Sequence, residues 1–387
     1  MPTDSSATGA VDRGRKTNVL IVASSLWIGG AESVIQHLAL TLDRRRFNVS
    51  VCCLKQRGHI GDEIANAGVD IVALAEEDQP KDRSRVDYFT FRKLAKVIRD
   101  RQIDVVHTHT SHGLVDACLC KVLLFRKLTV VHTFHFGNYP HTRPRIMWME
   151  RIFSRLADRL YAVGNVQRKQ LQRVYGFSDR AIGTVWNGVS TDQHAGDPAI
   201  ATRLGAGDRL IIGTIATYIE QKGLRDLIQV ARRVRDAGHD VRFVVVGEGH
   251  LRPELEALAR SQGVEDSVIL TGWITHAARV ALPHFDVFFQ PSLWEAMSMV
   301  VLEAMAAGKA VVATRVGENP HIIKDGVDGL LVDPKDVDGM TAALIRVIED
   351  RALRQRLSEG ARRKVTERFA VAHMTRSYED VYLAAVR

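Results

Sequence analysis

Cysteine, aromatic residues and long apolar runs are scarce in this sequence, and each scarcity excludes a class of protein. The four cysteines among 387 residues form no C-x-x-C pair, so we expect reduced core thiols and neither a disulfide framework nor a zinc ribbon. Aromatic residues make up 6% of the chain, too few for the stacking platforms that bind nucleic acid. No apolar run approaches the roughly 20 residues that cross a bilayer.

The start of the chain and its net charge set further expectations. Residues 1–17 are small and polar and lack the apolar core of a secretory signal. We expect them to form a disordered tail on a cytoplasmic protein. The formal net charge of +8 favours anionic partners such as nucleotide phosphates or anionic lipid head groups.

Short β-branched runs alternate with stretches of helical periodicity, which predicts parallel sheets with helical crossovers. Twelve strands exceed what one open sheet usually holds. The sequence therefore predicts an α/β protein with two doubly wound, Rossmann-like domains that face each other across a cleft. The expected strands are residues 18–24, 48–54, 69–74, 103–107, 129–133, 159–163, 210–216, 241–247, 267–271, 286–290, 310–314 and 329–332.

The expected domain boundaries follow from where periodicity is weakest. Residues 188–208 are rich in glycine and show the least periodicity, so we place a linker at 191–208. The domains are then residues 18–190 and 209–369, followed by a helix at 370–387 that can pack on either domain. Parallel sheets bind ligands at the carboxyl ends of their strands, so the expected site lies between the domains.

A glycine pair follows the first expected strand. Gly29 and Gly30 precede a stretch of helical periodicity, and glycines at a helix start let backbone N–H groups approach an anion closely. The pair does not match the G-x-G-x-x-G dinucleotide fingerprint. By itself it predicts only a tight turn.

A more specific pattern follows the expected strand at 286–290. Ser298 is a suitable N-cap and Gly308 a suitable residue just beyond the C-terminus of a helix at 299–307. The start of this helix would lie at the carboxyl edge of the second sheet, which is where a ligand is expected.

Two glutamates stand on either side of that helix start. Glu295 falls in the preceding loop and Glu303 on the second turn, with the free N–H groups of Met299 and Val300 between them. Helix-start amides suit phosphate, and carboxylates suit sugar and ribose hydroxyls. The alternative is a pair of unrelated glutamates that form ordinary ion pairs.

This segment resembles the E-x7-E motif of the family 4 glycosyltransferases, retaining enzymes with two Rossmann-like domains (the GT-B fold). The resemblance extends over almost the whole chain, with the motifs in matching order and spacing. The matching segments are Gly29-Gly30-Ala31-Glu32, His107-Thr108-His109, Thr133-Phe134-His135, Asn187-Gly188-Val189, Gln221-Lys222-Gly223, Gly247-Glu248-Gly249, residues 303–314 and residues 325–332.

The resemblance implies a role for each matching position. Glu303 would hold the donor ribose, Glu295 the donor sugar, and Lys222 the diphosphate leaving group. His135 would face the donor sugar and complete the catalytic set with Glu295 and Lys222, while His109 would line the acceptor side. The full donor-binding set is Gly29, Gly30, Thr217, Lys222, Gly247, Trp273, Glu295, Met297, Ser298, Met299, Val300 and Glu303.

One position departs from the family pattern. The family usually carries an arginine five residues before this lysine, and here that position is Thr217, which brings no charge to the diphosphate. We expect another group to take its place, with Arg315, Lys309 or an acceptor-borne group as the candidates. A homologue that binds a nucleotide-sugar without catalysis is the alternative.

The sequence predicts no metal and no other cofactor. Asp336 and Asp338 form a D-x-D pair of the kind that binds metal in the other glycosyltransferase fold, but they open an expected helix and are interpreted as its cap. His107 and His109 lack carboxylate partners at ligand spacing.

A basic amphipathic segment lies in the N-terminal half. Such a helix can lie on an anionic membrane, here the inner face of the cell membrane, or can pack on its own sheet by its apolar face. The sequence leaves both interpretations open. The segment interleaves Arg143, Arg145, Arg151, Arg155 and Arg159 with Ile146, Met147, Trp148, Ile152, Phe153 and Leu156.

The function that the resemblance implies is a retaining hexosyltransferase (EC 2.4 class). Its donor would be a nucleotide-diphosphate-sugar, with a UDP-sugar favoured and a GDP-sugar next. Its acceptor would be a glycan or a lipid-linked intermediate of polysaccharide or glycoconjugate synthesis, and no nucleic-acid partner is expected. Besides the non-catalytic homologue, a sugar-nucleotide epimerase of the same fold is an alternative.

Overall fold

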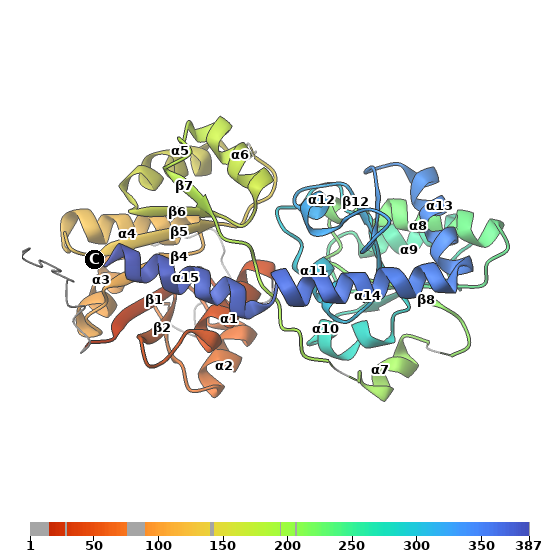
Figure 1. Cartoon of the computed structure of the whole chain (residues 1–387), viewed down its shortest axis with the longest axis horizontal. Coiled ribbons are helices and arrows are strands. Elements are labelled where there is room, and N and C mark those ends of the chain that lie inside the picture. The colour runs from red at the N-terminus through yellow and green to blue at the C-terminus, as the bar shows by residue number, and fades with distance from the viewer. Residues whose placement is uncertain are drawn as a thin grey trace, which may run out of the picture.

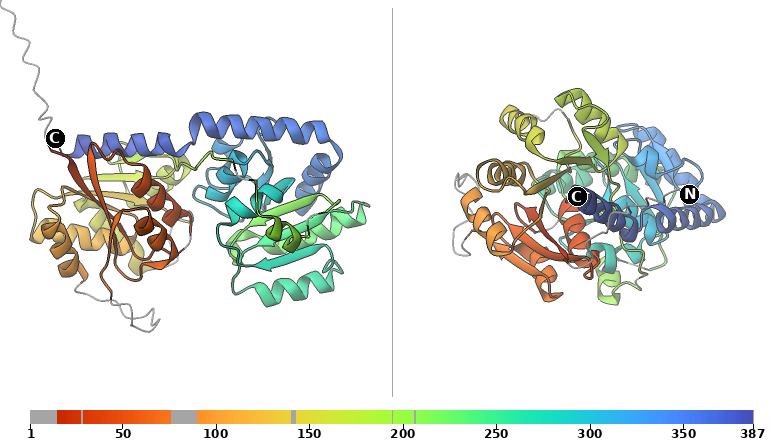
Figure 2. Two further views of the ribbon diagram at one scale, coloured as in Figure 1. Left: turned by 90° about the horizontal axis from the view of Figure 1, so that it is seen from below. Right: turned by 60° about the vertical axis from the view of Figure 1, so that its left-hand side comes forward.

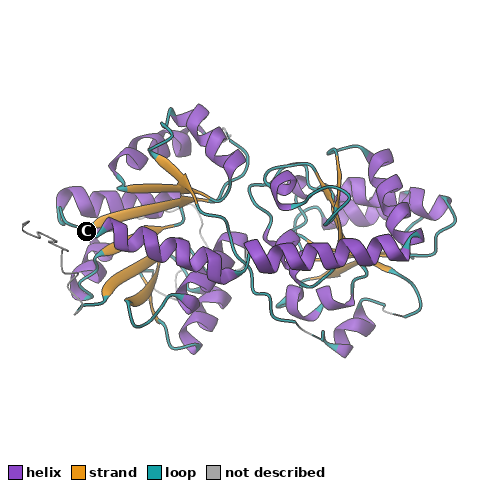
Figure 3. Ribbon diagram, in the orientation of Figure 1, coloured by secondary structure: helices purple, strands orange, loops and turns teal. Residues whose placement is uncertain are grey.

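The chain folds into two α/β domains that lie side by side, each with helices on both faces of a central sheet (Figures 1 and 3). The computed structural model describes residues 15–27, 29–75, 90–139, 143–193, 195–205 and 207–386. The tail expected at 1–17 therefore lies almost entirely outside the described residues.

The N-terminal domain has a seven-stranded parallel sheet in the order β3-β2-β1-β4-β5-β6-β7. The strand order reverses between β1 and β4, and such switch points are where open α/β sheets bind ligands. The elements are β1 (Thr17–Ala23), α1 (Gly30–Thr41), β2 (Phe47–Cys53), α2 (Gly58–Asn66), β3 (Asp70–Ala73), α3 (Thr90–Asp100), β4 (Val105–Thr108), α4 (Ser111–Leu123), β5 (Thr129–Phe134), α5 (Pro144–Phe153), β6 (Arg159–Ala162), α6 (Asn165–Tyr175) and β7 (Ile182–Thr184).

The C-terminal domain has a six-stranded parallel sheet in the order β10-β9-β8-β11-β12-β13, with the matching switch between β8 and β11. Its elements are α7 (Pro198–Arg203), β8 (Ile211–Ile215), α8 (Leu224–Asp236), β9 (Arg242–Val246), α9 (Arg252–Ser261), β10 (Val268–Gly272), α10 (Ala277–Val280), β11 (Val287–Gln290), α11 (Met299–Ala306), β12 (Ala310–Thr314), α12 (Asn319–Ile322), β13 (Leu330–Val332), α13 (Val337–Glu349) and α14 (Arg351–Arg368). The last helix, α15 (Val371–Ala385), returns to the N-terminal domain. Short 3₁₀ helices lie at Ser154–Leu156, Glu220–Lys222 and Leu282–His284.

The predicted fold class is confirmed by these two sheets. All twelve expected strands are present, with ends within two residues of those expected. The thirteenth, β7, was missed because it is only three residues long and contains a glycine. The segment expected as a linker contains α7, and Arg203 at its end donates a hydrogen bond to the carbonyl of Thr271 in the C-terminal domain.

The chain crosses between the domains twice, and the two crossings lie side by side. The first crossing passes Val189 and the second passes Ala370, and these residues form an isolated parallel bridge. A Cβ on Gly188 would lie 2.7 Å from the Cα of Val371, so only glycine allows this approach. Helices α14 and α15 flank the second crossing and run along one side of both domains (Figure 2).

Helix α15 inserts two buried tyrosines into the N-terminal domain. The hydroxyl of Tyr382 lies 2.7 Å from Nδ1 of His107, and that of Tyr378 lies 2.9 Å from Oγ1 of Thr133. His107 also lies 2.8 Å from Thr133 through Nε2. The last helix of the chain therefore belongs to the core of the first domain, where buried hydrogen bonds fix it.

We predict that Tyr382→Phe lowers the free energy of unfolding by about 1–3 kcal/mol, because it leaves a buried imidazole nitrogen without a partner. Urea unfolding followed by fluorescence measures this change. Ser377→Ala on the exposed face of α15 is the control and should have little effect. Equal effects of both substitutions would contradict the role given to the buried contact.

Candidate active site

A cleft of about 610 Å³ lies between the domains, at the carboxyl edges of both sheets. It is lined by His135 and by every residue of the expected donor-binding set. His109 is the exception among the expected site residues. It is buried behind His135 and does not line the cleft.

Helix α11 begins where the sequence predicted. The side chain of Ser298 caps it by accepting from the backbone N–H of Val301, at 3.4 Å. Gly308 follows its C-terminus with a left-handed φ of 66°. The N–H groups of the first turn have no acceptor within the helix, and Met299 and Val300 line the cleft. The helix start can therefore receive an anion.

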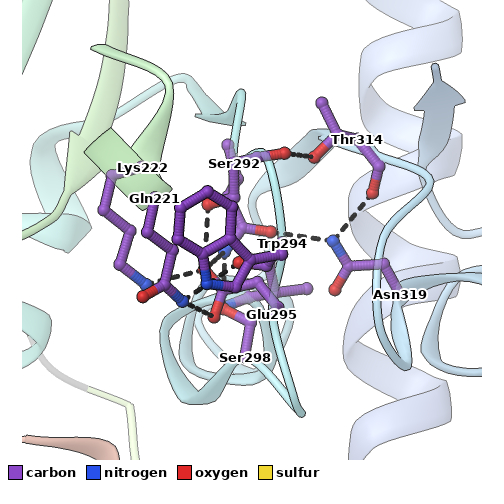
Figure 4. Close-up of polar contacts among 10 residues, drawn as sticks. Gln221, Lys222, Ser292, Trp294, Glu295, Ser298, Thr314 and Asn319 are labelled. Carbon is purple, nitrogen blue, oxygen red and sulfur yellow. Dashed lines mark hydrogen bonds and ion pairs between the residues drawn. The ribbon is translucent and has the colours of Figure 1, made fainter. Parts of the chain in front are cut away.

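Glu295 is held at the base of the cleft by an ion pair (Figure 4). Its side chain is 7% exposed, and its Oε1 lies 2.6 Å from Nζ of Lys222. The hydroxyl of Ser292 donates to the same oxygen at 2.8 Å. Both expected catalytic residues of the C-terminal domain are therefore in contact.

The loop that carries Glu295 is fixed by a buried polar network (Figure 4). Gln290 donates to the hydroxyl of Ser298 at 2.6 Å and accepts from the amide of Asn319 at 2.8 Å. Thr314 donates to the carbonyl of Ser292 at 2.6 Å. These bonds tie the loop to the strands on either side, so the carboxylate and the start of α11 keep a fixed relative position.

Glu303 lies on the second turn of α11, and its carboxylate forms no hydrogen bond or ion pair with any other described side chain. Burial raises the pKa of Glu303 to about 7. A carboxylate with this pKa gains from any ligand hydroxyl that donates to it, which suits the ribose contact that the resemblance implied.

His135 stands on the opposite wall, just beyond the end of β5. Its Nε2 lies 2.8 Å from Nδ1 of His109, and the His109 ring contacts that of His107 at a tilt of 43°, with centroids 4.1 Å apart. Burial lowers the pKa of His135 to about 4 and that of His109 well below its usual range. The imidazole of His135 in the cleft is therefore neutral, and the buried imidazole of His109 holds it in position.

Arg315 and Lys309, the two side chains named as candidates to replace the missing arginine at Thr217, lie elsewhere, so that part of the prediction was wrong. Thr217 is exposed in the cleft. Arg315 pairs with Asp325 at 3.4 Å, and Lys309 donates to the carbonyl of Pro283 at 2.7 Å. Neither cation lines the cleft, where the only described Lys or Arg side chain besides Lys222 is Arg279.

The two domains touch around the cleft. A Cβ on Gly137 would lie 2.2 Å from the backbone nitrogen of Ala296, so glycine is required where this loop of the N-terminal domain meets the Glu295 loop. The buried carboxylate of Glu318 accepts from the backbone N–H of Gln167, at 3.2 Å, at the start of α6. These contacts describe a closed arrangement of the domains.

Helix α5 packs on its own domain through only part of its apolar face, because Met147 and Phe153 are half-buried against the core. Its only buried residue is Glu150, which accepts from the hydroxyl of Ser111 at 2.5 Å and from that of Tyr175 at 2.6 Å. Trp148 is 66% exposed. Trp148 and Ile152 remain exposed on the outer face of this helix.

Two further interpretations from the sequence are confirmed. Asp336 caps α13 by accepting from the N–H of Gly339 at 2.9 Å, and the nearby Asp338 pairs with Arg233. The four cysteines are free and buried, and burial raises the pKa of Cys53 to about 12. These thiols are therefore inert at neutral pH.

Sequence reasoning missed residues whose role depends on long-range contacts. Tyr378 and Tyr382 hold α15 on the N-terminal domain, Glu318 joins the two domains, and Arg279 enters the cleft from α10. Gln290 could have been found, since an amide at the end of an apolar strand beside the E-x7-E segment suggests a structural contact. The other residues carry no local signal.

Comparison with known proteins identifies the class. A family model described as glycosyl transferases group 1 matches residues 199–364, and one described as glycosyltransferase family 4 matches residues 28–193. Together they cover both domains, and the chain belongs to the family 4 glycosyltransferases. The predictions that the chain belongs to this family and that it is an enzyme are confirmed. The two alternatives, an epimerase and a non-catalytic homologue, are therefore not favoured.

Relatives and solved structures agree with this class. The chain is 26% identical over 312 residues to the UDP-Gal:alpha-D-GlcNAc-diphosphoundecaprenol alpha-1,3-galactosyltransferase of Escherichia coli, covering 76% of this chain and 78% of that one. It is 25% identical to the glycogen synthase of Mycobacterium tuberculosis, covering 93% and 92%. The structure of HepE from Anabaena with UDP and glucose superposes with a TM-score of 0.83 at 18% identity, covering 95% and 100%. This last likeness confirms the GT-B fold.

We predict that nucleoside diphosphate affinity rises between about pH 6 and 8 with the ionisation of Glu303, whose folded pKa is about 7. The ionised form accepts ribose hydroxyls more strongly than the protonated form. Titration calorimetry of wild type and Glu303→Gln separates this effect from ionisation of the ligand phosphate. The variant should bind about 10-fold or more weakly at pH 8 and lose most of the pH dependence. An identical pH profile in both proteins would remove Glu303 from the site.

Proposed function

We propose that this glycosyltransferase transfers a hexose from a UDP-sugar to a glycan or lipid-linked acceptor with retention of anomeric configuration, in glycoconjugate synthesis. The observation that carries the proposal is the Lys222–Glu295 pair beside the free start of α11, with Glu303 on the same helix. A diphosphate, a ribose and a sugar each find a matching group within one cleft.

The diphosphate would lie between Lys222 and the first-turn amides of α11. Negative charge grows on the departing diphosphate as the glycosidic bond breaks, and fixed donors lower that barrier most when they are already in place. Gly29 and Gly30 at the start of α1 allow a second helix start to approach from the other wall. No residue in this arrangement requires a metal ion.

Retention is supported by the imidazole on the opposite wall. An inverting reaction needs a base near the acceptor whose pKa is close to the working pH. The pKa of His135 is about 4, too low for an efficient base at pH 7. His135 serves better as a neutral hydrogen-bond partner of the sugar, and the departing phosphate oxygen can take the acceptor proton on the same face.

UDP is the favoured nucleotide because the E. coli relative is named for UDP-Gal and the HepE structure contains UDP. GDP is the next candidate. The same relative is named for a diphosphoundecaprenol-linked acceptor, which supports a lipid-linked acceptor for this chain.

We predict that the protein turns over a UDP-sugar in the presence of EDTA and gives a product with the anomeric configuration of the donor. Proton NMR of the anomeric coupling constant reads the configuration directly. His135→Ala should lower kcat, because a partner of the sugar is lost. Loss of turnover in EDTA that magnesium or manganese restores would contradict the metal-free mechanism, and an inverted product would contradict retention.

A second prediction follows from the missing positive charge at position 217, where the family usually has an arginine. Because Arg315 and Lys309 do not reach the cleft, Thr217→Arg should place a guanidinium beside the diphosphate and tighten UDP binding by about 10-fold. Thr217→Gln, of similar length but neutral, is the matched control. If Thr217→Arg weakened UDP binding and Thr217→Gln did not, another cation, such as Arg279, would already occupy this space.

The exposed residues of α4 and α5 support contact of the N-terminal domain with an anionic membrane, where a lipid-linked acceptor would be found. Leu123 at the end of α4 is exposed like Trp148, the two helices are in contact, and Arg151 lies on the same helix as Trp148. Apolar side chains flanked by cations bind such surfaces. Among the described residues, no helix is both long and apolar enough to cross a membrane.

We predict that the protein floats with vesicles containing phosphatidylglycerol and that Trp148→Ser reduces the bound fraction several-fold, since one tryptophan contributes a large share of the buried apolar area. Val327→Ser, at an exposed apolar position of the C-terminal domain, is the control. Binding that is unaffected by Trp148→Ser would contradict docking through α5.

A further inference from the structure

Two histidines and a glutamate, none of them part of the Lys222–Glu295 pair, meet in the lining of the cleft. Oε1 of Glu63 lies 2.8 Å from Nε2 of His59 and 3.4 Å from Nε2 of His276. One ligand atom from each of the three residues lies within 4.8 Å of the other two. All three residues line the cleft.

The three residues come from opposite domains. His59 and Glu63 are four residues apart on α2, so their side chains lie on one face of that helix. His276 precedes α10 in the C-terminal domain and has a left-handed φ of 53°. This backbone conformation is uncommon for a residue other than glycine and is kept only where the surroundings impose it. It directs the imidazole across the cleft to Glu63.

Two of the three ligand atoms have no competing hydrogen bond from outside the cluster. Nε2 of His59 and Oε1 of Glu63 are shielded from solvent, and apart from the ion-pair contacts of the cluster itself neither is bonded to a described residue. The other carboxylate oxygen of Glu63 accepts from the amide of Gln36 at 2.6 Å. A second partner of this kind orients a metal-binding carboxylate and is a usual part of such sites.

The spacing fits a small transition-metal ion. Zinc binds histidine nitrogen and carboxylate oxygen at about 2.0–2.2 Å, so neighbouring ligands of a tetrahedral ion lie about 3.3 Å apart. The distances from Oε1 of Glu63 to the two imidazole nitrogens, 2.8 and 3.4 Å, lie on either side of that value. Three protein ligands leave one position for water. Calcium and magnesium prefer oxygen ligands and do not fit this set.

We propose that His59, Glu63 and His276 form an interdomain zinc site that holds the cleft closed. The ion would join α2 to the segment before α10 and so oppose separation of the domains. It takes no part in sugar transfer, because the ligands differ from the groups assigned to the diphosphate and the sugar. Bound zinc would slow the exit of the nucleotide, which must leave between the same two domains.

Zinc titration of the EDTA-dialysed full chain by calorimetry tests the site. We expect wild type to bind one zinc ion, and His59→Ala and His276→Ala to lose about 10-fold or more in affinity, since each removes one of three protein ligands. His250→Ala is the matched control, because this exposed histidine of the C-terminal domain lies outside the cleft lining. Circular dichroism checks that each variant is folded.

Stopped-flow release of a fluorescent nucleoside diphosphate tests the closing effect. Zinc should slow release several-fold in wild type and in His250→Ala, but not in His276→Ala. Equal zinc affinity in wild type and His276→Ala, or equal slowing of release in both, would overturn the proposal. Sugar transfer in EDTA is measured separately, so failure of the zinc site would leave the proposed transferase function standing.

Discussion

The ion pair between Lys222 and Glu295 is the interaction on which the cleft depends. It joins the 3₁₀ helix after β8 to the loop after β11, the two strands at the switch point of the C-terminal sheet. Breaking such a pair leaves a buried charge without a partner, at a typical cost of 3–5 kcal/mol. In the closed cleft Glu295 is the partner of Lys222, and an arriving diphosphate would compete for the same ammonium group. The buried network of Gln290, Ser298 and Asn319 keeps the loop in place during that exchange.

The second constraint is the crossing of the chain at α15. The tyrosines of this helix contact His107 and Thr133 in the core of the first domain, and His109 connects that layer to His135 in the cleft. The C-terminal helix therefore supports the wall that faces the sugar. The chain crosses between the domains at the adjacent segments around Val189 and Ala370, so a separation of the domains would bend these segments.

Local pattern was enough to predict the two sheets and α11, because strand alternation, the Ser298 cap and Gly308 act over a few residues. It failed where contacts are long-range. Arg315 and Lys309 are close to the E-x7-E segment in sequence, yet they bind Asp325 and the carbonyl of Pro283. The periodicity of α5 could not show that Glu150 is its buried residue, since that depends on Ser111, Tyr139 and Tyr175. Nor could the sequence bring His276 to Glu63, because they lie in different domains.

The central claim is that Lys222 binds the diphosphate of the donor. Calorimetric affinities of UDP and of uridine for wild type and Lys222→Ala test it most directly. The substitution removes a cation and leaves the Glu295 carboxylate to repel phosphate, so UDP affinity should fall about 10- to 100-fold. Uridine, which has no phosphate, should bind both proteins equally. Unchanged UDP affinity in Lys222→Ala would contradict the assignment of this cleft to a nucleotide-sugar.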